Sequence, residues 1–245
     1  MKHITSADNS LIKKAASLKE KKYREKYGLF LIEGWRAVKD AISSGAEIEC
    51  VLAEEGQESG LSQNLPELYV IPRRLMEKVC DTASPQGIAA LVRIKRQQPG
   101  TLLRCLVLDG ISDPGNLGTI IRTAAACGLK EILLCGCADP YNPKCVRATM
   151  GGLLHVNLFE IGAEEAINAI KGAGIPLLCA HMDGKNIFEL EKPTDFALVI
   201  GSEAHGVSET FLKACDEVIS LPMENVESLN AAVCASVMMY LLIHS

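Results

Sequence analysis

The stretch Leu108-Asp-Gly-Ile-Ser-Asp-Pro-Gly-Asn-Leu-Gly-Thr-Ile-Ile-Arg122 joins an apolar run to a glycine-bearing loop and then to a helical pattern. A strand that passes through such a loop into a helix is the repeating unit of parallel α/β sheets. Strands that are apolar on both faces predict a parallel sheet covered by helices on both sides. Apolar runs at 102–108, 131–134, 177–180, 197–200 and 218–221 alternate with helical patterns at 117–127, 163–172, 209–214 and 229–243.

The chain divides near residue 98, in the polar segment Arg93-Ile-Lys-Arg-Gln-Gln-Pro-Gly100, which ends in a loop signal. We therefore expect one domain over residues 1–97 and a second over 98–245. The first reads as a small α/β domain. Its helical patterns cover 9–27 and 35–43, and its strand patterns cover 28–32, 48–52, 68–71 and 88–92.

The composition narrows the class of protein. The chain has 245 residues, 48% of them hydrophobic, with neither a membrane-spanning run nor a signal peptide, so we expect a cytoplasmic protein. The net charge is −5, yet residues 1–40 hold ten Lys and Arg against five Asp and Glu. This basic stretch fits either an arm that binds phosphate or a solvated helix face. The ten cysteines form no C-x-x-C pair and mostly lie in apolar runs, so we expect buried thiols and no metal site.

The loop after the strand at 102–108 resembles neither common nucleotide-binding signature. Two glycines have P-loop spacing, but Asn116 and Leu117 stand where Lys and Ser/Thr are required, and the dinucleotide pattern is absent. Asn116 is a candidate helix cap. Gly118 would let an anion approach the first helical turn, and Arg122 follows one turn later on the same face. The pair could clamp a phosphate, or it could be a helix cap with a surface arginine.

Two further strand ends are polar and glycine-rich, and ligands of such sheets bind beyond the carboxyl ends of the strands. In Gly201-Ser-Glu-Ala-His-Gly206, Gly201 allows close approach of a ligand, whereas Glu203 either faces the site or caps the next helix. His205 reads as a surface residue. In the third segment, Ser228 and Asn230 begin a helix. Ser228 is explained as a cap, and no Ser/His/Asp order makes it a nucleophile.

The order of these motifs is specific. Asn-x-Gly-x-x-x-Arg, Gly-x-Glu-x-x-Gly and Leu-Pro-Met…Ser-Leu-Asn resemble the three signature motifs of the SpoU (TrmH-type) 2′-O-ribose RNA methyltransferases, members of the SPOUT superfamily. Lys144-Cys-Val-Arg-Ala-Thr-Met-Gly151 is similar to that family's Arg-Ala-Ser-Met-Gly segment. Upstream, Phe30-Leu-Ile-Glu-Gly34 and Ser84-Pro-Gln-Gly-Ile88 resemble its substrate-binding domain, which has an L30e-like fold.

The resemblance implies an α/β protein with a small L30e-like domain followed by a trefoil-knotted parallel-sheet domain that works as a homodimer. It implies S-adenosylmethionine as methyl donor, held in the knot. The residues that match the cofactor site are Gly201, Leu221, Met223, Leu229 and Ala180. The residues that match the catalytic motifs are Arg122, which would activate the 2′-hydroxyl, and Asn116, Glu203, Ser228 and Asn230, which would position the reactants.

The first domain would recognise structured RNA. The resemblance favours 23S (large-subunit) ribosomal RNA; the alternatives are transfer RNA, and a non-catalytic RNA-binding protein of ribosome assembly. Three departures bear on substrate orientation: Ala231 and Ala232 after the third motif, Glu224 where a glycine is common nearby, and Thr149 in place of serine. The expected phosphate contacts are Lys13, Lys14, Lys21, Lys22, Arg24, Arg36 and Arg147.

Overall fold

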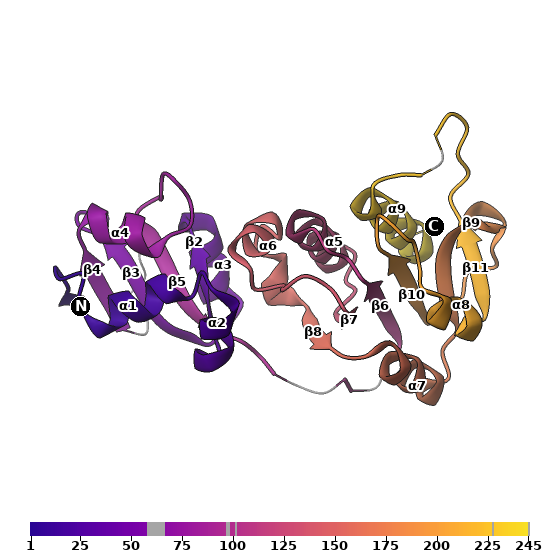
Figure 1. Cartoon of the computed structure of the whole chain (residues 1–245), viewed down its shortest axis with the longest axis horizontal. Helices are drawn as coiled ribbons and strands as arrows, with labels where there is room; N and C mark the ends of the chain where they lie inside the picture. The colour runs from indigo at the N-terminus through magenta and orange to yellow at the C-terminus, as the bar shows by residue number, and fades with distance from the viewer. Residues whose placement is uncertain (58–66, 97–98, 101, 227, 245) are drawn as a thin grey trace. The chain divides into compact units, whose positions relative to one another are not determined.

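The computed structural model describes residues 1–57, 67–96, 99–100, 102–226 and 228–244. The chain packs into two compact units (Figure 1). Unit 1 is Met1–Lys95 with Asp139–Leu154, and unit 2 is Arg96–Ala138 with His155–Ser245. The domain boundary that the sequence predicts between residues 97 and 98 lies outside the described residues and stays a prediction.

Unit 1 is built on a mixed five-stranded sheet in the order β1-β4-β3-β5-β2. Strand β4 pairs parallel with β1 and β3, whereas β5 pairs antiparallel with β3 and β2. The strands are β1 (Lys2–His3), β2 (Leu29–Glu33), β3 (Ile48–Glu54), β4 (Glu67–Ile71) and β5 (Ile88–Arg93). The helices are α1 (Ser10–Ser17), α2 (Lys21–Tyr27), α3 (Trp35–Ser43), α4 (Arg73–Val79) and α6 (Pro143–Ala148).

The single basic helix predicted over 9–27 is wrong, because the chain forms two helices with a break between them. Helix α1 ends at Ser17, and Leu18, its C-cap, is almost fully buried in the core of unit 1. Helix α2 starts at Lys21 and ends at Tyr27, and its C-cap Gly28 adopts the left-handed conformation with φ +63°. The break between the two helices lies at the buried Leu18, and no proline or glycine in the sequence marks it.

Unit 2 contains the expected parallel sheet, with six strands in the order β11-β9-β10-β6-β7-β8. Central strand β10 is buried at every residue, as a strand covered on both faces must be. Strands are β6 (Arg104–Asp109), β7 (Glu131–Cys135), β8 (Asn157–Glu160), β9 (Leu177–Asn186), β10 (Phe196–Gly201) and β11 (Glu217–Ser220). Helices are α5 (Pro114–Ala126), α7 (Ala163–Ala173), α8 (Glu209–Ala214) and α9 (Ala231–His244), with the single turn η3 (Ile187–Glu189); the turn η2 (Gly152–His155) spans the boundary between the two units.

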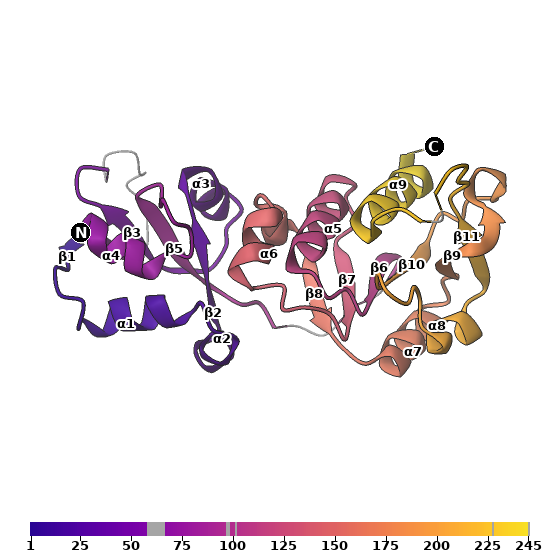
Figure 2. The ribbon, with the colours of Figure 1, turned by 45° about the horizontal axis from the view of Figure 1, so that its top comes forward.

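Helices cover both faces of this sheet. Figure 2 shows α5 and α9 on one face and α7 and α8 on the other. The face under α7 and α8 holds a continuous apolar core that includes Val107, Leu133, Val199 and Phe211. Among the described residues, no helix is long and apolar enough to cross a membrane. The predicted α/β class is confirmed, and the trefoil knot implied by the resemblance stays a prediction.

Candidate functional site

Side chains from all three sequence motifs meet at the carboxyl edge of the parallel sheet. Asn116 Nδ2 donates a hydrogen bond to Glu203 Oε1 at 2.6 Å. Asn230 Nδ2 donates to Asn116 Oδ1 at 3.1 Å. The structure therefore links Glu203, Asn116 and Asn230 in one chain of side-chain hydrogen bonds, which we call the motif chain.

The two helices that carry the asparagines are capped next to the motif chain. Asp113 caps α5 and accepts from the backbone N–H of Asn116 at 2.9 Å, with Pro114 in the first turn. Asn230 caps α9, since its Oδ1 accepts from the N–H groups of Ala232 at 2.9 Å and Val233 at 3.3 Å. These contacts correct two predictions: Asn116 lies inside the first turn of α5 instead of capping it, and Asn230, not Ser228, caps α9.

A tight hairpin places Glu203. Strand β10 ends at Gly201, and Ser202 and Gly206 then exchange two backbone hydrogen bonds of 3.1 and 2.9 Å, leaving Glu203 exposed at the tip. A Cβ atom on Gly201 would lie 2.0 Å from the carbonyl carbon of Gly206, so only glycine fits at this strand end. The expectation that Glu203 caps the following helix is wrong, because its carboxylate accepts from Asn116 and Ser208 precedes α8.

One residue that sequence reasoning missed supports this hairpin. Asp109 ends β6, and its Oδ2 accepts from the backbone N–H of Ser208 at 2.7 Å. The carboxylate thereby ties the segment after the hairpin to the neighbouring strand, which pairs Asp109 with Gly201. The signal in the sequence is a single acidic residue that closes an otherwise apolar strand.

The predicted cofactor residues lie on or after three neighbouring strands. Gly201 ends β10, Ala180 lies in β9, and Leu221 and Met223 follow β11. Ala180, Leu221 and Met223 are half-buried and Leu229 is 39% exposed. Apolar side chains with free surface beside a strand-end glycine suit an adenine ring and its ribose, so the residues present fit S-adenosylmethionine.

Strand β9 departs from regular pairing beside these residues. Val218 of β11 pairs with Cys179, but the next residue, Ile219, pairs with Lys185. The segment 180–184 therefore leaves the ladder. Ser220 Oγ donates to the carbonyl of Gly184 at 2.8 Å, which fastens the end of this segment to β11.

Arg122 is exposed on α5, one turn after the buried Gly118. Among the residues that the structure describes, no acidic side chain forms an ion pair with its guanidinium. The neighbouring Thr123 contacts Ser236 of α9 through a 2.9 Å hydroxyl–hydroxyl hydrogen bond. The guanidinium is thus left available to a ligand on a helix that is fixed at its cap and along its side.

The predicted RNA contacts in unit 1 differ in availability. Arg24 is 3% exposed, donates to the backbone carbonyls of Leu18 and Lys19, and pairs with Asp139. Its burial contradicts the prediction that it contacts phosphate. Arg36 is exposed. The remaining cations lie in ion pairs, Lys13 with Asp8, Lys14 with Glu49, Lys21 with Glu25, Lys22 with Glu20 and Arg147 with Asp81.

The cysteines are free thiols, and most are buried. Burial raises the pKa of Cys105 and of Cys135 to about 12 each, so both stay protonated at neutral pH. Metal binding needs the thiolate. Within the described ranges, no three His, Cys, Asp or Glu side chains gather as a metal site would require.

Comparisons with known proteins identify the family of the chain. Residues 104–240 match the SpoU rRNA Methylase family, and residues 9–90 match the MRM3-like substrate binding domain. The chain is 33% identical to the 23S rRNA (guanosine(2553)-2′-O)-methyltransferase RlmP of Bacillus subtilis (strain 168), over 98% of both chains.

Solved structures give the same assignment. The AdoMet-bound rRNA methyltransferase of Sinorhizobium meliloti superposes with a TM-score of 0.87 at 25% identity, covering 98% of this chain and 97% of that one. The SpoU methyltransferase AviRb of Streptomyces viridochromogenes, also in complex with AdoMet (S-adenosylmethionine), superposes with a TM-score of 0.83 at 25% identity, covering 96% and 97%.

The chain carries a mixed-sheet domain followed in the sequence by a parallel sheet with polar motifs gathered at its carboxyl edge, and its matches define an RNA methyltransferase of the SpoU type. The chain belongs to the SpoU rRNA Methylase family. The predicted class, an S-adenosylmethionine-dependent RNA ribose 2′-O-methyltransferase with an N-terminal substrate-binding domain, is confirmed.

Proposed function

We propose that the protein transfers the methyl group of S-adenosylmethionine to a ribose 2′-hydroxyl of 23S (large-subunit) ribosomal RNA. The observation that carries the proposal is the motif chain, which joins Glu203, Asn116 and Asn230 from three separate sequence motifs. The relative from Bacillus subtilis is named for this reaction on a guanosine of 23S rRNA. A cytoplasmic location follows from such a substrate.

Arg122 is the group we assign to the 2′-hydroxyl. A guanidinium is a poor general base because it stays charged in proteins. Its physically easier role is to hydrogen-bond the 2′-oxygen and stabilise the negative charge that develops as the proton leaves for solvent. S-adenosylmethionine, when bound, supplies an electrophilic methyl group. The guanidinium is exposed on a helix that Asp113 caps, which suits contact with a substrate oxygen.

The motif chain positions the reactants around Arg122. Asn116 and Asn230 orient each other by a 3.1 Å hydrogen bond, and Glu203 accepts from Asn116. These polar atoms lie at the edge where the ribose must enter, and Ser228 lies two residues before the cap of α9. We assign the adenosine part of the cofactor to the strand ends and segments that carry Gly201, Leu221, Met223, Leu229 and Ala180.

RNA recognition belongs to unit 1 in this proposal. Exposed ion pairs such as those of Lys13, Lys21 and Lys22 contribute little stability, so phosphates can replace the carboxylates cheaply. Lys14 is also held over the ring of Tyr27. The proposed phosphate contacts also include Arg36 and Arg147, whereas Arg24 is excluded because it is buried.

A homodimer is the proposed assembly. Helix α9 exposes Val233, Val237 and Tyr240, with exposed fractions of 48%, 39% and 49%. Residues spaced by four and three positions lie on one helix face. An apolar stripe of this kind on a helix beside the motif chain suits burial against a second copy of the same chain.

The test combines cofactor binding with methylation of RNA. Calorimetry on the wild-type protein should detect S-adenosylmethionine binding, and ribosomal RNA from cells lacking the gene should lose one 2′-O-methyl group. Arg122→Ala should lower the methylation rate about 100- to 1000-fold, the usual effect of removing one oxyanion donor. Cofactor affinity should stay unchanged, which separates a catalytic defect from unfolding.

Three results would contradict the proposal. A wild-type protein without affinity for S-adenosylmethionine would indicate the non-catalytic assembly protein. A methyl group lost from transfer RNA instead of ribosomal RNA would replace the substrate. An Arg122→Ala variant with full activity would remove the role assigned to that guanidinium.

A further inference from the structure

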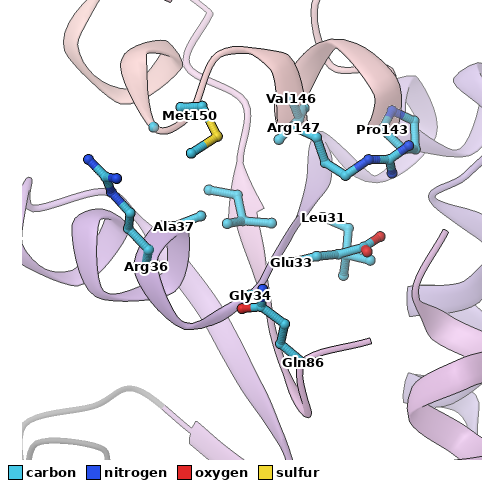
Figure 3. Close-up of a pocket in the computed structure, with 12 residues that line it drawn as sticks. Leu31, Glu33, Gly34, Arg36, Ala37, Gln86, Pro143, Val146, Arg147 and Met150 are labelled. Carbon is cyan, nitrogen blue, oxygen red and sulfur yellow. The ribbon is translucent and has the colours of Figure 1, made fainter. Parts of the chain in front are cut away.

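Unit 1 contains a cavity of about 210 Å³ between β2, α3 and the segment that carries α6. Leu31 and Ala37 form one wall, and Val146 and Met150 form the wall opposite (Figure 3). Its polar lining includes Arg36 and Gln86. None of the residues that line the cavity is among those that we assign to methyl transfer.

The size of the cavity limits its occupant. A cavity of about 150 Å³ holds one benzene molecule, whereas pockets for drug-sized ligands measure about 300–1,000 Å³. At about 210 Å³ the cavity admits one heterocyclic ring system and excludes a whole S-adenosylmethionine molecule. Apolar walls on two sides suit the flat faces of such a ring.

A hydrogen-bonding group at the cavity is held in a fixed orientation. Gln86 Oε1 accepts from the backbone N–H of Trp35 at 3.3 Å, and it lies so close to Gly34 that a Cβ atom there would stand 2.9 Å from it. Gly34 adopts φ +93°, a conformation that other residues rarely take. With its oxygen engaged, Gln86 presents its amide N–H₂ to a ligand, and no described residue accepts from that nitrogen.

The second arginine of the cavity is fixed by a relay of carboxylates. Arg147 Nη1 donates to Asp81 Oδ2 at 2.8 Å. The backbone N–H of Asp81 in turn donates to Glu33 Oε1 at 2.7 Å, and Thr82 Oγ1 donates to Glu33 Oε2 at 2.9 Å. Asp81 and Glu33 thus hold Arg147 in place, whereas Arg36, on the opposite side of the cavity, pairs with no described carboxylate (Figure 3).

Met150 lies at the cavity wall, just after the end of α6. It has φ +48°, a left-handed conformation that is uncommon for a long unbranched side chain. Its side chain is nevertheless 47% exposed and lines the cavity. Met150 takes this conformation as the residue that follows the C-cap of α6, and its exposed side chain leaves apolar surface at the cavity for a ligand to cover.

We propose that this cavity takes one unpaired base of the RNA substrate, with Arg36 on the adjacent phosphate. RNA is read mainly through unstacked bases that enter apolar pockets and hydrogen-bond through their edges. The walls from Leu31 and Met150 supply the apolar surface, Gln86 supplies the donor, and Arg36 supplies the charge. The inference rests on the proposed function, because it requires an RNA substrate.

The experiment uses the full-length protein and a chemically synthesised RNA hairpin with the sequence of the large-subunit region that contains the methylated nucleotide. A set of hairpins lacks the base at one unpaired position each. Ala37→Leu fills the cavity with a residue that favours helix, and Ala37→Ser is its size-matched control. We expect Ala37→Leu to weaken binding of the intact hairpin about 10-fold, because a base kept out of the cavity loses its apolar burial there.

The set of hairpins identifies the base. The hairpin that lacks the recognised base should bind the wild-type protein more weakly by the same factor. Ala37→Leu should not weaken the binding of that hairpin any further. Arg36→Ala, which changes an exposed side chain, should lower the slope of log affinity against log salt by about 0.7. Arg104→Ala, an exposed arginine at the start of β6, is the matched control and should leave the slope unchanged.

Equal losses for Ala37→Leu on every hairpin, or wild-type affinity and methylation in Ala37→Leu, would overturn the inference and leave the proposed function standing. A wild-type protein that methylates no RNA would remove the proposed function and this inference with it. Unchanged S-adenosylmethionine affinity in Ala37→Leu shows that unit 2 is intact.

Discussion

Replacing Asn116 by aspartate tests the motif chain with a change of almost no volume. In wild type, Asn116 Nδ2 donates to Glu203 Oε1 at 2.6 Å. In Asn116→Asp, two carboxylate oxygens would face each other there. The lost hydrogen bond removes about 1 kcal/mol. Two charges about 3 Å apart repel by about 1.4 kcal/mol in bulk water and about 5.5 kcal/mol at the effective dielectric constant of a protein surface.

Two effects keep the repulsion between the two carboxylates near the value for bulk water. The pair is exposed, so the side chains can separate in solvent. The variant carboxylate would also lie in the first turn of α5, where the helix dipole favours it by about 0.3–1 kcal/mol. We therefore expect Asn116→Asp to lower the free energy of unfolding by about 2 kcal/mol at pH 8.

The assay is urea unfolding followed by circular dichroism at pH 8 and pH 5. Asn116→Ala is the control, because it loses both side-chain hydrogen bonds, about 1 kcal/mol each, without adding a charge, so its deficit should be the same at the two pH values. Repulsion requires both carboxylates to be ionised. The folded variant therefore binds protons more readily than the unfolded chain, and its deficit grows as the pH rises. A deficit of Asn116→Asp that does not grow from pH 5 to pH 8, relative to that of Asn116→Ala, would refute the geometry of the motif chain.

Three more expectations follow from the structure. Gly201→Ala should abolish methylation and destabilise the protein, because its Cβ would meet backbone at 2.0 Å, whereas Gly172→Ala, with open space around it in α7, should stabilise by about 0.5–1 kcal/mol in thermal unfolding. Cys105 and Cys135, with pKa values of about 12, should resist a thiol reagent at pH 8 until urea unfolds the protein; rapid native labelling would contradict their burial. Val237→Glu should shift the mass measured by light scattering from dimer to monomer with an unchanged circular dichroism spectrum, and an unaffected dimer would place the interface elsewhere.

The sequence predicts most of unit 2 because its strands are uninterrupted apolar runs. Strand β10 was expected over 197–200 and spans Phe196–Gly201. The pattern fails where packing decides. Arg24 belongs to a basic run that reads as a solvent face, yet tertiary contacts with Asp139 bury it. Helix α6 has six residues, too few for a helical period to stand out.

The candidate site, too, could be predicted only in part from the sequence. Asn116, Glu203 and Asn230 are recognisable as motif residues, since each follows an apolar strand or starts a helix. Their partners are not recognisable, because the contacts join residues more than eighty positions apart. The cavity of unit 1 was not predicted, because the motif segments 30–34, 84–88 and 144–151 are recognisable one by one but nothing in the sequence shows that they line a common cavity.

The return of residues 139–154 to unit 1 limits how this protein can be dissected or recombined. Phe30 of β2 packs on Tyr141 with ring centroids 5.0 Å apart, and Arg24 depends on Asp139 for its carboxylate. A truncation after residue 97 would remove Tyr141 and Asp139 from unit 1. Phe30 would then be exposed, and the buried Arg24 would lack its carboxylate. A chimaera that exchanges RNA specificity between enzymes of this type therefore has to transfer both segments of unit 1, residues 1–95 and 139–154, together.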